Sequence, residues 1–119
     1  MVFLALWFGF ILIGSVMPAS GPKTDLPVDK IVHFILYGMT SIFLFRHFVN
    51  KETVNRAFYM SVAIVSLYGA AMEVVQYFLP YRSFSLGDMA ANILGAFSGC
   101  VLYMKGKRIY NKIVSLGAD

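Results

Sequence analysis

Apolar residues gather in four stretches along the chain, separated by short polar segments. None of these stretches alternates with a period of two, so membrane-spanning β-strands are not expected. A bilayer core of about 30 Å needs roughly 20 helical residues, with about 17 to 25 acceptable, and the last three stretches fit this range. The pattern therefore predicts an all-α fold: a polytopic transmembrane bundle of four helices, in one domain over residues 1–119. The predicted helices lie near Val2–Met17, Ile31–Val49, Ala57–Leu79 and Leu86–Met104.

The first stretch is the shortest, and an apolar run at the start of a chain can be a cleaved signal peptide. No basic residue precedes it, and it is longer than the usual apolar core of a signal peptide, about 7 to 15 residues. The segment Val16–Ser20 resembles a cleavage site only weakly. We therefore expect this stretch to be retained as the first helix.

The links between the stretches are short. Prolines and a glycine in residues 18–30 end the first helix and delay the second, whereas Asn50–Arg56 and Pro80–Ser85 are brief turns. Neighbouring helices should therefore run antiparallel, up-down-up-down. Seven basic residues then lie at one end of the bundle and three at the other, so the positive-inside rule places both termini in the cytoplasm. The three on the predicted outer side are Lys23, Lys30 and Arg82.

Composition agrees with a lipid environment. Of the residues, 59% are hydrophobic and only 13% charged, and the mean hydropathy is +0.72. The net charge of +4 lies at helix ends, which suits phospholipid head groups and not nucleic acid. The single cysteine, Cys100, allows no intrachain disulfide and is expected to be a small packing residue. We expect a multi-pass protein of the bacterial cytoplasmic (inner) membrane.

Polar residues collect at the predicted outer ends of the second, third and fourth helices. Asp29, His33 and Tyr37 are spaced i, i+4, i+8 and share one helix face. Charged groups within a membrane are costly, by about 2.5 to 3.5 kcal/mol each, so they should face the bundle interior and find partners. We expect Arg82 or Lys30 near Glu73, and His33 hydrogen-bonded to Asp29 or Asp88. The candidate ligand-binding residues are Asp29, Lys30, His33, Tyr37, Glu73, Gln76, Arg82, Ser85, Asp88 and Asn92.

Several of these residues also have a purely structural interpretation. Ser85 and Asp88 match a capping box for the fourth helix. Asp29 can complement the positive end of the second helix, Lys30 can reach lipid phosphates, and Asn92 can join helices. Glu73 lies inside a helix and needs no such role, so with Arg82 it favours a functional pocket.

A stripe of small residues, Gly95-x-x-x-Gly99 extended by Ala91, marks the fourth helix. Such stripes let helix backbones approach closely. This face can pack on a neighbouring helix of the same bundle, or it can form an oligomer with another chain.

The order of the polar residues resembles the VanZ-like family, roughly from Pro18 to Gly99. The resemblance implies an integral membrane protein of the cell envelope. The namesake of the family is associated with low-level resistance to the glycopeptide antibiotic teicoplanin, without a change in the peptidoglycan precursor terminus. One departure is Tyr81, where relatives often have glycine. The matching string is Asp29-Lys30-x-x-His33-Phe34-x-x-Tyr37, then Glu73-x-x-Gln76-x-x-x-Pro80-x-Arg82-x-x-Ser85-x-x-Asp88-x-x-x-Asn92-x-x-Gly95-x-x-x-Gly99.

Three functions remain open at this point. The first is an outward-facing pocket for a lipid-linked or amphipathic envelope ligand, with Arg82 and Lys30 on a phosphate or carboxylate. The second is an enzyme acting on such a ligand through His33, Glu73 and Asp88, although no known nucleophile motif is present. The third is a structural or partner-assembly protein. A metal held by His33 and two carboxylates is disfavoured because no recognised ligand spacing exists, so no metal or cofactor is expected.

Overall fold

The computed structural model describes residues 2–18 and 27–116, and within them the chain is helical with no strand. The predicted outer-side residue Lys23 lies outside the described residues, as does most of the first link. The all-α prediction with four helices is confirmed. The helices are α1 (Val2–Val16), α2 (Val28–Phe48), α3 (Val54–Tyr77) and α4 (Leu86–Leu116).

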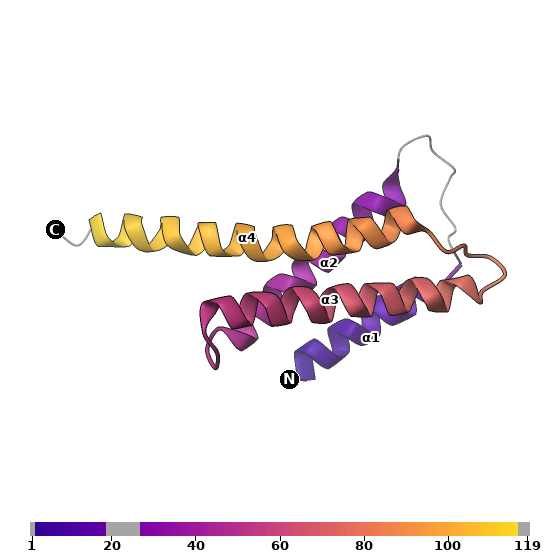
Figure 1. Ribbon diagram of the computed structural model, residues 1–119, viewed down its shortest axis with the longest axis horizontal. Helices are drawn as coiled ribbons and strands as arrows, with labels where there is room; N and C mark the ends of the chain where they lie inside the picture. The colour runs from indigo at the N-terminus through magenta and orange to yellow at the C-terminus, as the bar shows by residue number, and fades with distance from the viewer. Residues whose placement is uncertain (1, 19–26, 117–119) are drawn as a thin grey trace.

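Three of the helices, α2, α3 and α4, are long and apolar enough to cross a membrane, so this is a multi-pass membrane protein. The predicted first span is shorter than a full crossing: α1 has 15 residues, or about 22 Å at 1.5 Å per residue. It lies beside the other helices as an apolar helix (Figure 1).

The predicted end of the fourth helix, near Met104, is wrong, because α4 continues to Leu116. The prediction followed the apolar stretch, which marks only the part of a helix that suits lipid. The residues that follow mix basic and polar residues with apolar ones and contain no proline, so the helix has no reason to stop. Figure 1 shows this part of α4 running beyond the other helices, and the molecule is 61 Å long.

The starts of α2 and α3 lie three residues earlier than predicted. Proline fixes its own φ near helical values, and α2 begins directly after Pro27. At the start of α3, the Thr53 side chain accepts a hydrogen bond from the Arg56 amide at 3.4 Å. A proline sets one start and a side-chain cap the other, and an apolar pattern reveals neither.

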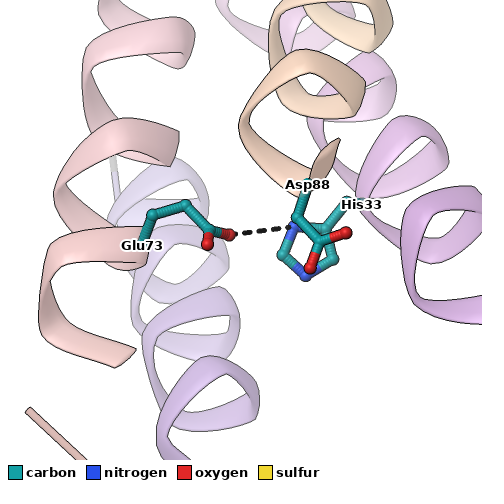
Figure 2. Close-up of side chains that lie close together, drawn as sticks. All are labelled: His33, Glu73 and Asp88. Carbon is teal, nitrogen blue, oxygen red and sulfur yellow. Dashed lines mark ion pairs between the residues drawn. The ribbon is translucent and has the colours of Figure 1, made fainter. Parts of the chain in front are cut away.

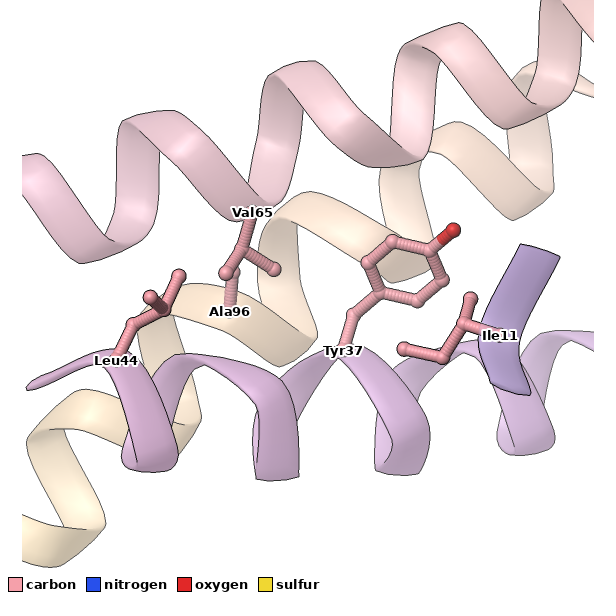
Figure 3. Close-up of a cluster of buried hydrophobic side chains, with 5 residues drawn as sticks. All are labelled: Ile11, Tyr37, Leu44, Val65 and Ala96. Atoms are coloured by element: carbon pink, nitrogen blue, oxygen red, sulfur yellow. The ribbon is translucent and has the colours of Figure 1, made fainter. Parts of the chain in front are cut away.

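The bundle has large apolar side chains outside and small or polar ones inside, as expected where lipid is the solvent. Leu67 and Leu102 are 71% and 64% exposed. Thr40, Ser41 and Ser61 are fully buried, and their hydroxyls donate to backbone carbonyls of their own helices. The main apolar core joins all four helices (Figure 3) through Ile11, Tyr37, Leu44, Val65 and Ala96.

Close packing of α4 on α2 explains the stripe of small residues. A Cβ atom added at Gly95 would strike the carbonyl oxygen of Phe34, and one added at Gly99 would strike that of Gly38. In the described residues α2 covers this face, which favours packing within the bundle, and an oligomer through the Gly95/Gly99 face stays a prediction. Cys100 beside it is buried, and its thiol donates to the Ser41 carbonyl at 3.7 Å, which confirms its predicted packing role.

Successive helices run in opposite directions (Figure 1), so four helix termini meet at one end of the bundle. We call this the polar end; it comprises the C-termini of α1 and α3, the N-termini of α2 and α4, and the turn between α3 and α4. The opposite end, which we call the basic end, carries Arg46, Lys51, Arg56, Lys105, Lys107, Arg108 and Lys112.

Candidate functional site

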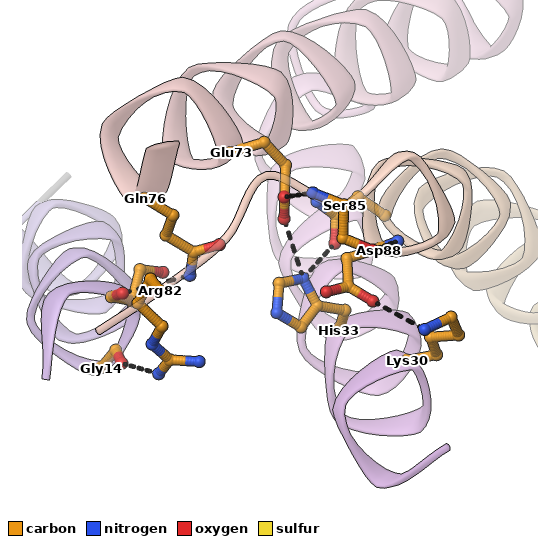
Figure 4. A network of polar contacts seen from close by, with 10 residues as sticks. Gly14, Lys30, His33, Glu73, Gln76, Arg82, Ser85 and Asp88 are labelled. Carbon is orange, nitrogen blue, oxygen red and sulfur yellow. Dashed lines mark hydrogen bonds and ion pairs between the residues drawn. The ribbon is translucent and has the colours of Figure 1, made fainter. Parts of the chain in front are cut away.

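All ten candidate residues lie at the polar end, but they form two groups that share His33. One group surrounds the start of α4, and the other lines a cavity between α1, α2 and α3 (Figure 4). The first group contains Lys30, His33, Glu73, Ser85, Asp88 and Asn92. The second contains Asp29, His33, Tyr37, Gln76 and Arg82.

The start of α4 is capped by Ser85, which directly precedes the helix, and by Glu73 of α3. Ser85 Oγ accepts a hydrogen bond from the Asp88 amide at 3.1 Å, which is half of the predicted capping box. The other half is replaced, since the Ser85 amide donates to Glu73 Oε2 of α3 at 3.1 Å. The Asp88 carboxylate instead lies 3.5 Å from the Lys30 ammonium. Glu73 therefore has a structural role that its position inside α3 concealed.

The ring of His33 connects α2 to α3 and α4. Its Nδ1 donates to Asn92 Oδ1 at 2.9 Å and lies 3.8 Å from Glu73 Oε1. The expected hydrogen bond from His33 to Asp29 or Asp88 is therefore wrong, because Asn92 occupies the position beside Nδ1. Asn92 is fully buried and joins α4 to α2, as its structural interpretation predicted.

Arg82 or Lys30 was expected near Glu73, but in the described residues neither forms an ion pair with it. Lys30 pairs with Asp88, whereas the Arg82 side chain points away from Glu73 and toward α1 (Figure 4). Arg82 Nη2 donates to the backbone carbonyls of Met17 at 3.0 Å and Gly14 at 3.5 Å. Glu73 and Arg82 thus belong to different groups and do not share one pocket.

Three side chains cap the C-terminus of α1, where helix carbonyls lack partners within the helix. Besides Arg82, Gln76 donates to the Ser15 carbonyl at 3.1 Å and Tyr81 to the Val16 carbonyl at 2.8 Å. The partial negative charge of a helix C-terminus adds to the attraction for Arg82. Tyr81, which sequence reasoning treated only as a departure from a family pattern, therefore has a definite contact.

The cavity of the second group has a volume of about 190 Å³. Its polar wall consists of Asp29, His33, Gln76 and Arg82, and its apolar wall comes mainly from α1 and α2. Tyr37 lies at its inner side, buried, with its ring stacked on that of His33 at a centroid distance of 6.0 Å. The α1 wall was missed in the sequence because it consists of Phe10, Ile11, Gly14 and Ser15, which carry no charge.

Buried polar atoms without a hydrogen-bond partner concentrate at the polar end. Within residues 2–18 and 27–116, these include Tyr37 Oη, Glu73 Oε1, Arg82 Nε, Asp88 Oδ1 and Asn92 Nδ2. Such atoms are uncommon in folded proteins, because each costs roughly 1 to 3 kcal/mol. This end of the bundle therefore has more hydrogen-bonding capacity than the described chain uses.

Comparison with known proteins identifies the family of the chain. An uncharacterized protein of Schizosaccharomyces pombe is 30% identical over 107 residues, which cover 88% of this chain and 62% of the relative. The chain thus spans less than two thirds of that relative. No solved structure matches the chain. The model of the VanZ/LLP1 family matches residues 1–110, which include every candidate site residue. The resemblance found in the motifs is confirmed, and the chain belongs to the VanZ/LLP1 family.

Proposed function

We propose that the cavity at the polar end binds the anionic head group of an amphipathic or lipid-linked envelope molecule. In this proposal the polar end faces outward from the bacterial cytoplasmic membrane, and both termini lie in the cytoplasm. The acyl or prenyl chain of the ligand lies along the apolar faces of α1 and α2. The ligand therefore enters the cavity sideways from the lipid bilayer.

The unpaired hydrogen-bond donors of Arg82 are the observation that carries this proposal. A guanidinium has five N–H donors, and the two hydrogen bonds of Arg82 are both made by Nη2. Its Nε is buried and has no partner in the described residues, although the side chain lines the cavity. A phosphate or carboxylate in the cavity would accept from this free edge of the guanidinium.

Cavity size limits the class of ligand. Pockets for drug-sized molecules occupy about 300 to 1,000 Å³, whereas this one has about 190 Å³. A phosphate-sized head group fits, and a whole glycopeptide does not. A contribution to teicoplanin resistance, which the family resemblance implies, is thus proposed as an indirect effect through the bound envelope molecule.

The other polar residues of the wall supply selectivity. His33 and Gln76 offer donors and acceptors at the cavity, and Asp29 accepts hydrogen bonds from hydroxyl or amine groups at its rim. A head group with both an anion and hydroxyls matches this set better than a purely anionic one. Three residues that the sequence analysis assigned to ligand contacts do not line the cavity and have no part in this role: Lys30, Glu73 and Asn92.

Replacing Arg82 by glutamine tests the proposal. We expect the purified wild-type protein to retain phosphatidylglycerol in preference to phosphatidylcholine when bound lipids are counted by native mass spectrometry. Arg82→Gln should weaken phosphatidylglycerol retention by about 10- to 100-fold, since a hydrogen bond to a charged group contributes roughly 1.5 to 3 kcal/mol.

Two control variants separate binding from folding. Tyr81→Phe removes a hydrogen bond to the same end of α1 but does not touch the cavity. Arg56→Gln removes an exposed basic group at the other end of the bundle. Both should retain phosphatidylglycerol like the wild type. Equal retention by Arg82→Gln, or equal loss in Tyr81→Phe, would contradict the proposal.

A further inference from the structure

We propose that His33, Glu73 and Asp88 form a binding site for one divalent transition-metal ion of the Zn²⁺ type. The three residues come from α2, α3 and α4, and one ligand atom from each lies within 4.8 Å of the others. Figure 2 shows the Glu73 carboxylate directed at the His33 ring, with the Asp88 carboxylate drawn over that ring in this view. This site shares His33 with the head-group cavity but does not include Arg82, and it does not depend on a bound head group.

The spacing of these atoms suits a small ion. Zinc binds imidazole nitrogen at about 2.0 to 2.1 Å and carboxylate oxygen at about 2.0 to 2.2 Å, so two ligand atoms of one ion lie at most about 4.3 Å apart. His33 Nδ1 and Glu73 Oε1 are 3.8 Å apart, within this limit. All three ligand atoms lie within 4.8 Å of one another, so they exceed this limit by at most about 0.5 Å.

The environment of Glu73 is a second, independent observation that favours a bound cation. Its side chain is fully buried, and only Oε2 accepts a hydrogen bond, from the Ser85 amide. Oε1 is directed at the His33 ring and has no hydrogen-bond partner in the described residues. A buried carboxylate oxygen needs a positive partner or a donor to offset its lost hydration. A metal ion between Glu73 and His33 would meet that need.

Asp88 and Asn92 complete the set of ligands. Asp88 Oδ1 also has no hydrogen-bond partner within residues 2–18 and 27–116, and its contact with Lys30, a side chain that is 51% exposed, is 3.5 Å long. Asn92 Oδ1 already lies 2.9 Å from His33 Nδ1. When the ion replaces the proton on Nδ1, this amide oxygen loses its donor and can serve as a fourth ligand.

Charge and ligand type favour zinc over magnesium or calcium. Two carboxylates and a neutral imidazole balance the two positive charges of the ion, which matters in a buried site. Mixed nitrogen and oxygen ligands including histidine are typical of zinc, whereas magnesium and calcium prefer oxygen alone. The bound imidazole keeps its proton on Nε2. The alternative is that a protonated His33 simply pairs with Glu73, and this requires no metal.

Metal analysis of the purified chain distinguishes the two. Metal is removed from the detergent-solubilised protein with a chelator, and the protein is dialysed against buffered micromolar Zn²⁺. Bound zinc is then measured by inductively coupled plasma mass spectrometry. We expect about one saturable zinc per chain, a higher unfolding temperature with Zn²⁺, and no such shift with Mg²⁺. A wild-type protein without a saturable site would overturn the proposal, whatever the variants do.

Variants locate the ion. His33→Gln and Glu73→Gln should each lower zinc affinity by at least about tenfold, since changing even a residue that only hydrogen-bonds to a metal ligand has an effect of this size. Glu73→Gln keeps an acceptor for the Ser85 amide, so it should fold. The matched control is His47→Gln, which removes the histidine at the basic end. Loss of zinc in His47→Gln, or full retention in both His33→Gln and Glu73→Gln, would place the ion elsewhere and refute the assignment.

Discussion

Replacing Gly99 by leucine is expected to abolish most of the folded protein. The added Cβ would strike the carbonyl oxygen of Gly38, and it would also lie 2.6 Å from Ser41 Oγ, so both the backbone and a buried side chain of α2 obstruct it. Backbone atoms cannot rotate away, and α2 and α4 would have to separate. We expect a loss of about 3 kcal/mol or more in the free energy of unfolding, at the upper end for overpacked cores.

Gly106→Leu is the matched control. Gly106 lies on the same helix, and a Cβ atom there would meet nothing within 4 Å. Each substitution replaces a helix-destabilising glycine by leucine within α4, so the two variants differ only in how the new side chain packs. The measurement is the fraction of protein that stays monodisperse in detergent after graded heating. Equal heat resistance of the two variants would show that α2 and α4 do not pack as described.

Replacing Glu73 by alanine has the second-largest expected effect. The substitution leaves the Ser85 amide at the start of α4 without an acceptor, removes the negative partner of His33, and opens a void in a fully buried position. An unsatisfied buried amide and a cavity each cost about 1 to 3 kcal/mol. We expect a total loss of about 3 kcal/mol in the free energy of unfolding, measured by denaturation with SDS in mixed micelles.

Glu73→Gln separates the parts of this effect. The glutamine carbonyl oxygen can still accept from the Ser85 amide and fill the space, so most of the stability should return. If Glu73→Gln were as unstable as Glu73→Ala, the negative charge itself would hold the helices together. The capping role described for Glu73 would then be secondary to an ion pair with His33.

Much of the fold was predictable because lipid demands long apolar helices and short polar turns. The four helices, the antiparallel order and the interior position of the small residues all follow from this demand. The end of α4 was not predictable in the same way. Beyond Met104 the helix no longer needs to be apolar, and propensity alone sets its length.

The candidate site was predictable as a region but not as a set of contacts. Spacing along α2, α3 and α4 indicated that polar residues meet at one end, yet spacing cannot show which side chains pair across helices. Glu73 accepts a hydrogen bond from the Ser85 amide at the start of α4 and does not pair with Arg82. Arg82 donates to a backbone carbonyl at the end of α1. Backbone carbonyls leave no signal in a sequence, so the contribution of α1 to the cavity was missed. The three proposed metal ligands come from three helices, so no ligand spacing along the chain marks them.

Photolabelling tests the central claim, that the cavity at the polar end holds a lipid head group, most directly. A phosphatidylglycerol analogue with a diazirine near its glycerol backbone would be incorporated into nanodiscs with the protein, activated by light, and its attachment sites mapped by peptide mass spectrometry. We expect labelling of the cavity walls at residues 10–15 of α1 and 32–37 of α2, and less labelling in Arg82→Gln. Labelling spread evenly over lipid-facing residues such as Leu67 and Leu102, and unchanged in Arg82→Gln, would contradict it.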